Sequence, residues 1–304
     1  MIRALLFVVA LLVALCSLAA VVTDVFSRPL LTSTPATVLD IPIELGIVRR
    51  SATVDGIPFD VFTPAGLLGP APAVVLAHGL DGSKERMFAF ANALVRSGFV
   101  VVAFDFSGHG DNHNPFPQDD NEIWATVDRD LDQAVRYTRT LPNVSGIYLL
   151  GHSLGAGAVV QYALKHPEIE GTVEVSGSNI VNTTPNLPRN LLMLVGSDEI
   201  ADVKQAAQEA ARNAGADAAG MLSFLNGHAR QAVTIPGVDH TTILINPETL
   251  NRSADWLMLA SIGRGSPLAT PNLLFVWFGV FLCSAISMLL LLVSALITRP
   301  SKGI

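Results

Sequence analysis

Cysteine is nearly absent from this chain of 304 residues, which contains only Cys16 and Cys283. Both lie inside long apolar runs, one near each end of the chain. The middle of the chain therefore has no cysteine to form a disulfide, and its stability must come from its hydrophobic core. With 50% hydrophobic residues, the chain has ample material for one.

Charged residues are also scarce, at 15% of the chain, and basic residues are in the minority. The 19 Lys and Arg against 26 Asp and Glu give a formal net charge of -7. A protein that binds nucleic acid needs clustered basic side chains to neutralise phosphates. Nucleic acid is therefore not expected as a partner.

Two uncharged stretches account for the high mean hydropathy of +0.46. They run from Ala4 to Val22 and from Leu273 to Ile297, over 19 and 25 residues. Each is long enough to cross a hydrocarbon core of about 30 Å as a helix. We expect a transmembrane helix in residues 272–298. Residues 1–26 are expected to form a second membrane anchor, which the length of the run favours, or a secretory signal.

The charges beside these runs favour one orientation in the membrane. Arg3 precedes the first run, and Arg299 and Lys302 follow the second. Because cytoplasmic flanks carry an excess of Lys and Arg, we expect both ends in the cytoplasm and the middle of the chain on the non-cytoplasmic face of a bilayer. Arg28 and Arg264, on the opposite flanks, weaken this asymmetry.

One central domain is expected over residues 36–262, joined to the apolar runs by tethers at 27–35 and 263–271. Within it, short apolar runs alternate with helix-spaced segments, and an antiparallel hairpin is expected before Pro72. This alternation is typical of a parallel sheet covered by helices on both faces. The apolar runs lie at 72–79, 99–110, 146–155, 171–177, 190–199 and 232–240. We therefore predict a doubly wound, mostly parallel α/β domain.

The segments between the later runs bear on whether the domain carries a lid. The interval from Ser178 to Arg189 is only 12 residues, too short for a large cap. The alanine-rich segment 201–231 is longer and is expected to be helical. It could overhang a site from the side of Asp198, which lies just before it in the sequence.

The sequence "GHSLG" at 151–155 matches the pattern G-x-S-x-G, directly after the apolar run "IYLL" and before a segment of helical character. In this strand–turn–helix context the two glycines permit a very tight turn, and Ser153 projects from its apex. Ser153 is the predicted nucleophile.

A serine hydroxyl needs a positioned base to take its proton, and that base needs an acid to orient it. Asp198 follows an apolar strand and His240 follows the next one, so both are expected at the carboxyl edge of the sheet. We predict Ser153, Asp198 and His240 as nucleophile, acid and base. Glu199 and Asp239 are the adjacent alternatives, interpreted as solvated loop charges.

The oxyanion that develops in acyl transfer needs preorganised hydrogen-bond donors. The "HGL" of residues 78–80 ends a predicted strand, so the backbone N–H of Leu80 is one candidate. The N–H of Leu154, directly after the nucleophile, is the other. Both roles belong to the backbone.

Histidines elsewhere receive ordinary interpretations. His109, Asp111 and His113 could suggest a metal, but no further ligand cluster accompanies them, and no metal is predicted. His152, beside the nucleophile, is expected to pack or form a hydrogen bond within the turn.

Taken in order, "HG" (78–79), "DFSGHG" (105–110), "GHSLG" (151–155), "GSDE" (196–199) and "DH" (239–240) resemble the α/β-hydrolase superfamily, in particular its esterase, lipase and dienelactone-hydrolase-like branches. The resemblance covers about residues 40–260. It implies a serine hydrolase that cleaves carboxylic esters and needs no cofactor. The two apolar runs, and not the resemblance, lead us to expect that this hydrolase is membrane-anchored and acts on small-molecule or lipid-like esters. A thioesterase or amide hydrolase with the same triad, or a non-catalytic scaffold that binds at the membrane, remains open.

Overall fold

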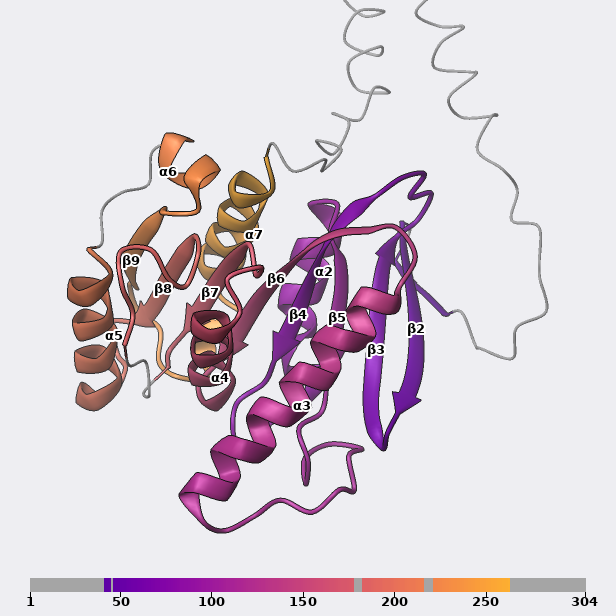
Figure 1. Cartoon of the computed structure of the whole chain (residues 1–304), viewed down its shortest axis with the longest axis horizontal. Coiled ribbons are helices and arrows are strands. Elements are labelled where there is room, and N and C mark those ends of the chain that lie inside the picture. Colours follow the sequence, from indigo (N-terminus) through magenta and orange to yellow (C-terminus); the bar gives the residue numbers. More distant parts are fainter. Residues whose placement is uncertain (1–40, 45, 178–181, 216–220, 263–304) are drawn as a thin grey trace, which may run out of the picture. The chain divides into compact units, whose positions relative to one another are not determined.

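The computed structural model describes residues 41–44, 46–177, 182–215 and 221–262. They form one sheet with helices on both of its faces (Figure 1). Its strands are β1 (Ile41–Glu44), β2 (Ile47–Val54), β3 (Ile57–Pro64), β4 (Ala71–Ala77), β5 (Val100–Phe104), β6 (Val144–His152), β7 (Gly171–Val175), β8 (Leu191–Gly196) and β9 (Arg230–Ile235).

The strands lie in the order β1-β2-β3-β5-β4-β6-β7-β8-β9. Neighbours from β5 to β9 are parallel, whereas β1, β2 and β3 add an antiparallel edge. The predicted mostly parallel sheet is therefore confirmed, and the expected hairpin before Pro72 is formed by β2 and β3. Strand β1 extends this antiparallel edge of the sheet, and the sequence pattern did not predict it.

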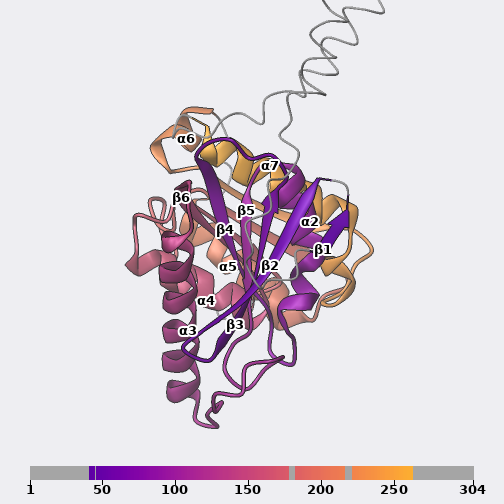
Figure 2. The ribbon, with the colours of Figure 1, turned by 90° about the vertical axis from the view of Figure 1, so that its right-hand side faces the viewer.

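Six helices are described: α2 (Phe88–Arg96), α3 (Asp120–Thr140), α4 (Leu154–Lys165), α5 (Ala201–Ala214), α6 (Met221–Asn226) and α7 (Pro247–Ser261). Two short 3-10 helices, η1 (Lys84–Met87) and η2 (Thr242–Leu244), lie in the loops. Helices α3, α4 and α5 cover one face of the sheet, and α2 and α7 cover the other, as Figures 1 and 2 show.

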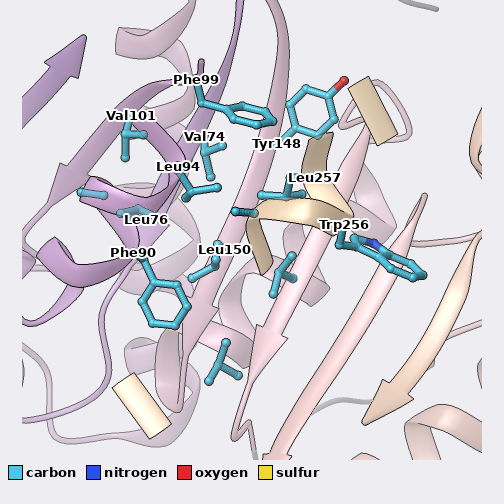
Figure 3. Packing of buried hydrophobic residues seen from close by; sticks show 14 of the residues in the cluster. Val74, Leu76, Phe90, Leu94, Phe99, Val101, Tyr148, Leu150, Trp256 and Leu257 are labelled. Carbon is cyan, nitrogen blue, oxygen red and sulfur yellow. The ribbon is translucent and has the colours of Figure 1, made fainter. Parts of the chain in front are cut away.

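Alternating residues of each central strand point to opposite faces of the sheet and belong to two separate hydrophobic cores. Both faces are apolar and are therefore covered by helices. On β4, Val74 and Leu76 face α2 and α7, while Ala73, Val75 and Ala77 face α3 and α4. Figure 3 shows the first core, where Phe90 and Leu94 of α2 approach Leu150 of β6. Because Leu150 is fully buried, truncating it to alanine should cost about 2–5 kcal/mol of stability.

Side chains at the starts of two helices show why they begin where they do. Asp119 accepts hydrogen bonds from the N–H groups of Asn121 and Glu122 at the start of α3. Asn246 does the same for α7, with Pro247 at its first turn. Each cap satisfies backbone donors that have no partner within the helix.

The described residues of the segment 201–231, which exclude 216–220, do not form a lid. Helix α5 packs onto β8 and β9, where Ala210 and Ala214 meet Leu191 and Met193. Phe224 of α6 packs against Trp256 of α7. The expectation that this segment overhangs the site was wrong for its described residues, because its apolar side chains cover the sheet instead.

The two terminal apolar runs, and with them the expected anchors at 1–26 and 272–298, lie outside the described residues. Within the described ranges, no helix combines the length and the apolar character needed to cross a membrane.

Candidate active site

Three loops at the carboxyl ends of parallel strands supply the functional side chains. Ser153 follows β6, Glu199 follows β8, and His240 follows β9. The carboxyl ends of parallel strands lie along one edge of a sheet, where α/β proteins place their ligand sites. Residues separated by more than 80 positions in the sequence therefore meet there.

The turn at Ser153 is as tight as its sequence predicts. Ser153 has φ 54° and ψ -116°, a conformation that residues with a side chain rarely adopt, and its N–H donates to the carbonyl of Val175. A Cβ on Gly151 would collide with the backbone of Gly155, and a Cβ on Gly155 would collide with the carbonyl of Ala77. Only glycine fits at these two positions, and the packing around them holds Ser153 in its strained conformation.

His240 joins the nucleophile to a carboxylate. Its Nε2 lies 2.9 Å from Ser153 Oγ, and its Nδ1 lies 3.1 Å from each carboxylate oxygen of Glu199. The Glu199 side chain is only 1% exposed. An ionised carboxylate only accepts hydrogen bonds, so Nδ1 carries the proton and Nε2 is left free to accept the proton of the serine.

The predicted acid, Asp198, was the wrong member of the "DE" pair. Its side chain is exposed and accepts a hydrogen bond from Ser197 Oγ at 2.9 Å. The chain turns directly after β8, with the Glu199 N–H donating to the Gly196 carbonyl. This turn directs Asp198 to solvent and Glu199 toward His240, so Glu199 completes the arrangement with Ser153 and His240.

The two predicted oxyanion donors belong to the loop after β4 and to the start of α4. The N–H groups of Leu80 and Leu154 have no acceptor among the described residues. Leu154 is the first residue of α4, where helix N–H groups lack intrahelical partners. Leu80 lines a cavity of about 200 Å³ that also contains Ser153 and His240.

His152 contacts the loop that carries His240, and its hydrogen bond is not made within the serine turn as expected. Its Nε2 lies 2.9 Å from the backbone carbonyl of His240 and donates to it. Burial, and next the proximity of His240, lower the pKa of His152 to about 4. A neutral His152 therefore holds the loop after β9 in place.

A second buried carboxyl lies on β7, the strand next to β6 in the sheet. Glu174 of β7 is fully buried, and its Oε1 accepts a hydrogen bond from the Gly177 N–H, while its Oε2 has no partner among the described residues. Burial raises the pKa of Glu174 to about 8. The Gly177 N–H opposes this shift, and the charge of Glu199 adds to it. Glu174 is therefore protonated at neutral pH. Nothing in the sequence of an apolar strand identified it as a buried acid.

Metal ligands do not gather in the described part of the chain. No group of three or more His, Cys, Asp or Glu side chains there could hold an ion. His109 Nδ1 lies 2.8 Å from the Ser107 carbonyl, while Asp111 pairs with Lys84.

Comparison of the whole arrangement with solved structures decides the fold. A CIB-like hydrolase of Thermoplasma acidophilum superposes with a TM-score of 0.52 at 15% identity, over 69% of this chain and 97% of that one. The chain has the α/β-hydrolase fold. A structure of a bacterial membrane phospholipase A shares this α/β-hydrolase fold with a TM-score of 0.50 at 15% identity, over 72% and 88% of the two chains.

Sequence comparisons agree with the α/β-hydrolase fold. Residues 69–218 match a family model described as serine aminopeptidase, S33. The sn-1-specific diacylglycerol lipase ABHD11 of Mus musculus is 32% identical over 115 residues, which cover 38% of this chain and 35% of the mouse protein. The chain thus matches about a third of the length of this curated relative.

Proposed function

We propose that the protein is a serine hydrolase that cleaves carboxylic esters through an acyl-enzyme. The observation that carries the proposal is the continuous chain of contacts from Ser153 through His240 to Glu199. A nucleophile, a base and an orienting acid at hydrogen-bond distance are what activation of a serine requires.

The first half of the reaction uses these contacts in order. Ser153 Oγ attacks the ester carbonyl carbon while its proton passes to His240 Nε2, and Glu199 stabilises the imidazolium that forms. The carbonyl oxygen becomes an oxyanion facing the N–H groups of Leu80 and Leu154. The C–O bond to the alcohol then breaks, and His240 Nε2 returns the proton to the leaving oxygen.

The second half releases the acid and restores the enzyme. Water gives a proton to His240 Nε2 and adds to the carbonyl carbon of the acyl group on Ser153. The bond to Ser153 Oγ then breaks, and the serine oxygen recovers its proton from His240. Every proton that moves is held by the protein or by water, so the scheme requires no cofactor.

Apolar side chains beside the site favour a lipid-like ester as substrate. Leu80 is 53% exposed, Ile200 65% and Ile245 70%. Leu80 lines the cavity, Ile200 directly follows Glu199, and Ile245 follows Leu244, which also lines the cavity. Exposed large apolar residues that gather at a site are typical of surfaces that meet other apolar groups. The name of the mouse relative, a diacylglycerol lipase, points the same way.

The chemistry of the triad also fits a thioesterase or an amide hydrolase, since all three reactions pass through an acyl-enzyme and differ in the group that leaves. A binding scaffold without turnover is the non-enzymatic alternative. Binding alone would not require the strained backbone conformation of Ser153. That conformation costs free energy, and the tight packing around Gly151 and Gly155 maintains it.

We further propose that the apolar runs around residues 4–22 and 273–297 anchor the domain on the non-cytoplasmic face of a membrane. Their length and lack of charge support this. Alkaline carbonate extraction of membranes tests it: the full chain should stay in the pellet, and a chain without both runs should be released. Release of the full chain would contradict the anchoring.

Hydrolysis of p-nitrophenyl esters from acetyl to palmitoyl tests the reaction. The wild-type protein should be active, with an optimum at medium or long acyl chains, and Ser153→Ala should lose activity. Ser97→Ala is a matched control, since Ser97 directly follows α2 and precedes β5, at the opposite edge of the sheet, and its hydroxyl donates to the Ala93 carbonyl. Absence of activity on every ester, thioester and amide tested would contradict the hydrolase and favour the alternative of a binding scaffold without turnover.

A further inference from the structure

Arg86 lies beside the nucleophile and has no role in the scheme above. It belongs to η1, the short helix that follows the Leu80 loop, and its side chain lines the same 200 Å³ cavity as Ser153 and His240. It is exposed. The guanidinium makes no hydrogen bond or ion pair with any side chain or carbonyl of the described ranges.

The other cation of η1 shows the contrast. Lys84 is 4% exposed, and its Nζ lies 2.6 Å from Asp105, 2.7 Å from Asp111 and 3.1 Å from Glu85. Lys84 is thus fully paired and fixes η1 against the loop after β5. The same short helix presents Arg86 to the cavity without a carboxylate.

The charges that line the cavity leave this cation available. Asp81 is the acidic residue that lines the cavity, and no ion pair joins it to Arg86. Glu199 is already paired with His240. The charge of Arg86 reaches the catalytic centre, since it is among the groups that depress the pKa of His152, after burial and His240.

A guanidinium offers several N–H donors in a planar fork that matches the oxygens of a carboxylate or a phosphate. An unpaired arginine on an ordinary surface is simply solvated. Here the arginine shares a small cavity with the nucleophile and an exposed apolar residue, Leu80, so an ester bound at Ser153 would lie next to it.

We propose that Arg86 determines substrate specificity by binding an anionic group, so that the preferred esters carry a carboxylate or a phosphate close to the scissile bond. Because the exposed apolar residue Leu80 lines the same cavity, such a substrate would be an amphiphile: an acyl ester with one apolar part and one anionic part. The proposal rests on the proposed serine hydrolase function.

The experiment compares pairs of esters in which one member carries an anionic group that the other lacks. One pair is p-nitrophenyl butyrate and mono-p-nitrophenyl succinate, which places a carboxylate on the acyl side. The other is a 1-acylglycerol and the matching 1-acylglycerol 3-phosphate, which places a phosphate on the alcohol side. The variants are Arg86→Gln, Arg86→Lys and, as a control of equal charge change, Arg136→Gln, because Arg136 pairs with Asp132 on the surface of α3.

In at least one pair, the wild-type protein should prefer the anionic ester, and Arg86→Gln should lower the ratio of kcat/KM for the anionic over the neutral ester by about fivefold, mainly through KM. Arg86→Lys should recover part of the ratio, and Arg136→Gln should leave it unchanged. Added salt should reduce the preference of the wild-type protein and not that of Arg86→Gln. The pair that responds tells on which side of the ester the anion lies.

An unchanged ratio in both pairs, or an equal loss on charged and neutral esters, would overturn the role of Arg86 while leaving the hydrolase intact. Absence of hydrolysis together with absence of fluorophosphonate labelling at Ser153 would overturn the proposed function itself, and the specificity role with it.

Discussion

His240 Nδ1 lies 3.1 Å from both carboxylate oxygens of Glu199, inside the protein, while the carboxylate of Asp198 one residue earlier points to solvent. The difference follows from the turn between Gly196 and Glu199. A buried carboxylate that accepts from Nδ1 both orients the imidazole and stabilises its protonated form. The proposed acid is therefore Glu199.

Substituting each of the two carboxylates, Glu199 and Asp198, by its amide distinguishes their roles in catalysis. Glu199→Gln keeps the shape of the side chain but removes its charge, so kcat for ester hydrolysis should fall on the order of 10³-fold. Asp198→Asn is the matched control and should stay within about twofold of the wild type, because its side chain bonds only Ser197 Oγ. The reverse pattern, with Asp198→Asn inactive and Glu199→Gln active, would show that the acid is misassigned.

The glycines of the serine turn should be intolerant of any side chain. In Gly155→Ala the new Cβ would lie well inside 3.0 Å of the Ala77 carbonyl, so the variant should lose about 3 kcal/mol or more of its unfolding free energy, measured by urea denaturation. Gly69→Ala makes the same chemical change where nothing lies within 4 Å and should be neutral. Equal stability of the two variants would show that the turn is looser than described.

Glu174 should make stability depend on pH. Burial raises its pKa to about 8 in the folded protein, above the ordinary value of 4.5, so the folded state keeps a proton that the unfolded chain releases. The stability from this group is complete below about pH 4.5 and is lost as pH rises toward 8, by an amount on the order of a few kcal/mol.

Urea denaturation at pH 5 and pH 8.5 checks this dependence on Glu174. Glu174→Gln carries no ionisable proton there, so the wild-type protein should lose stability relative to the variant as pH rises. Groups common to both proteins cancel in this comparison. A constant difference between the two proteins across this range would mean that Glu174 ionises at its ordinary pKa.

Much of the fold could be predicted because it depends on local pattern. The apolar runs that form β4 to β9 are short, buried and separated by helical segments. The glycines around Ser153 are required sterically, and the pattern at 151–155 already indicates this. The contact between Ser153 and His240 followed from their places at strand ends, while the roles of the Leu80 and Leu154 N–H groups stay predictions.

The remaining features depend on geometry that a linear pattern does not carry. Whether Asp198 or Glu199 faces inward is set by a single turn. Glu174 was hidden because a buried acid within an apolar strand has no distinctive spacing, and Arg86 gained interest only once η1 was seen beside the cavity. In each case the missing information was the direction of one side chain.

The most direct test of the central claim is to locate a covalent adduct by mass spectrometry after treatment with a fluorophosphonate. The account predicts one modification per chain, on the peptide that contains Ser153, with no modification in Ser153→Ala and markedly slower modification in Glu199→Gln. An unmodified protein, or an adduct on a different serine, would contradict it.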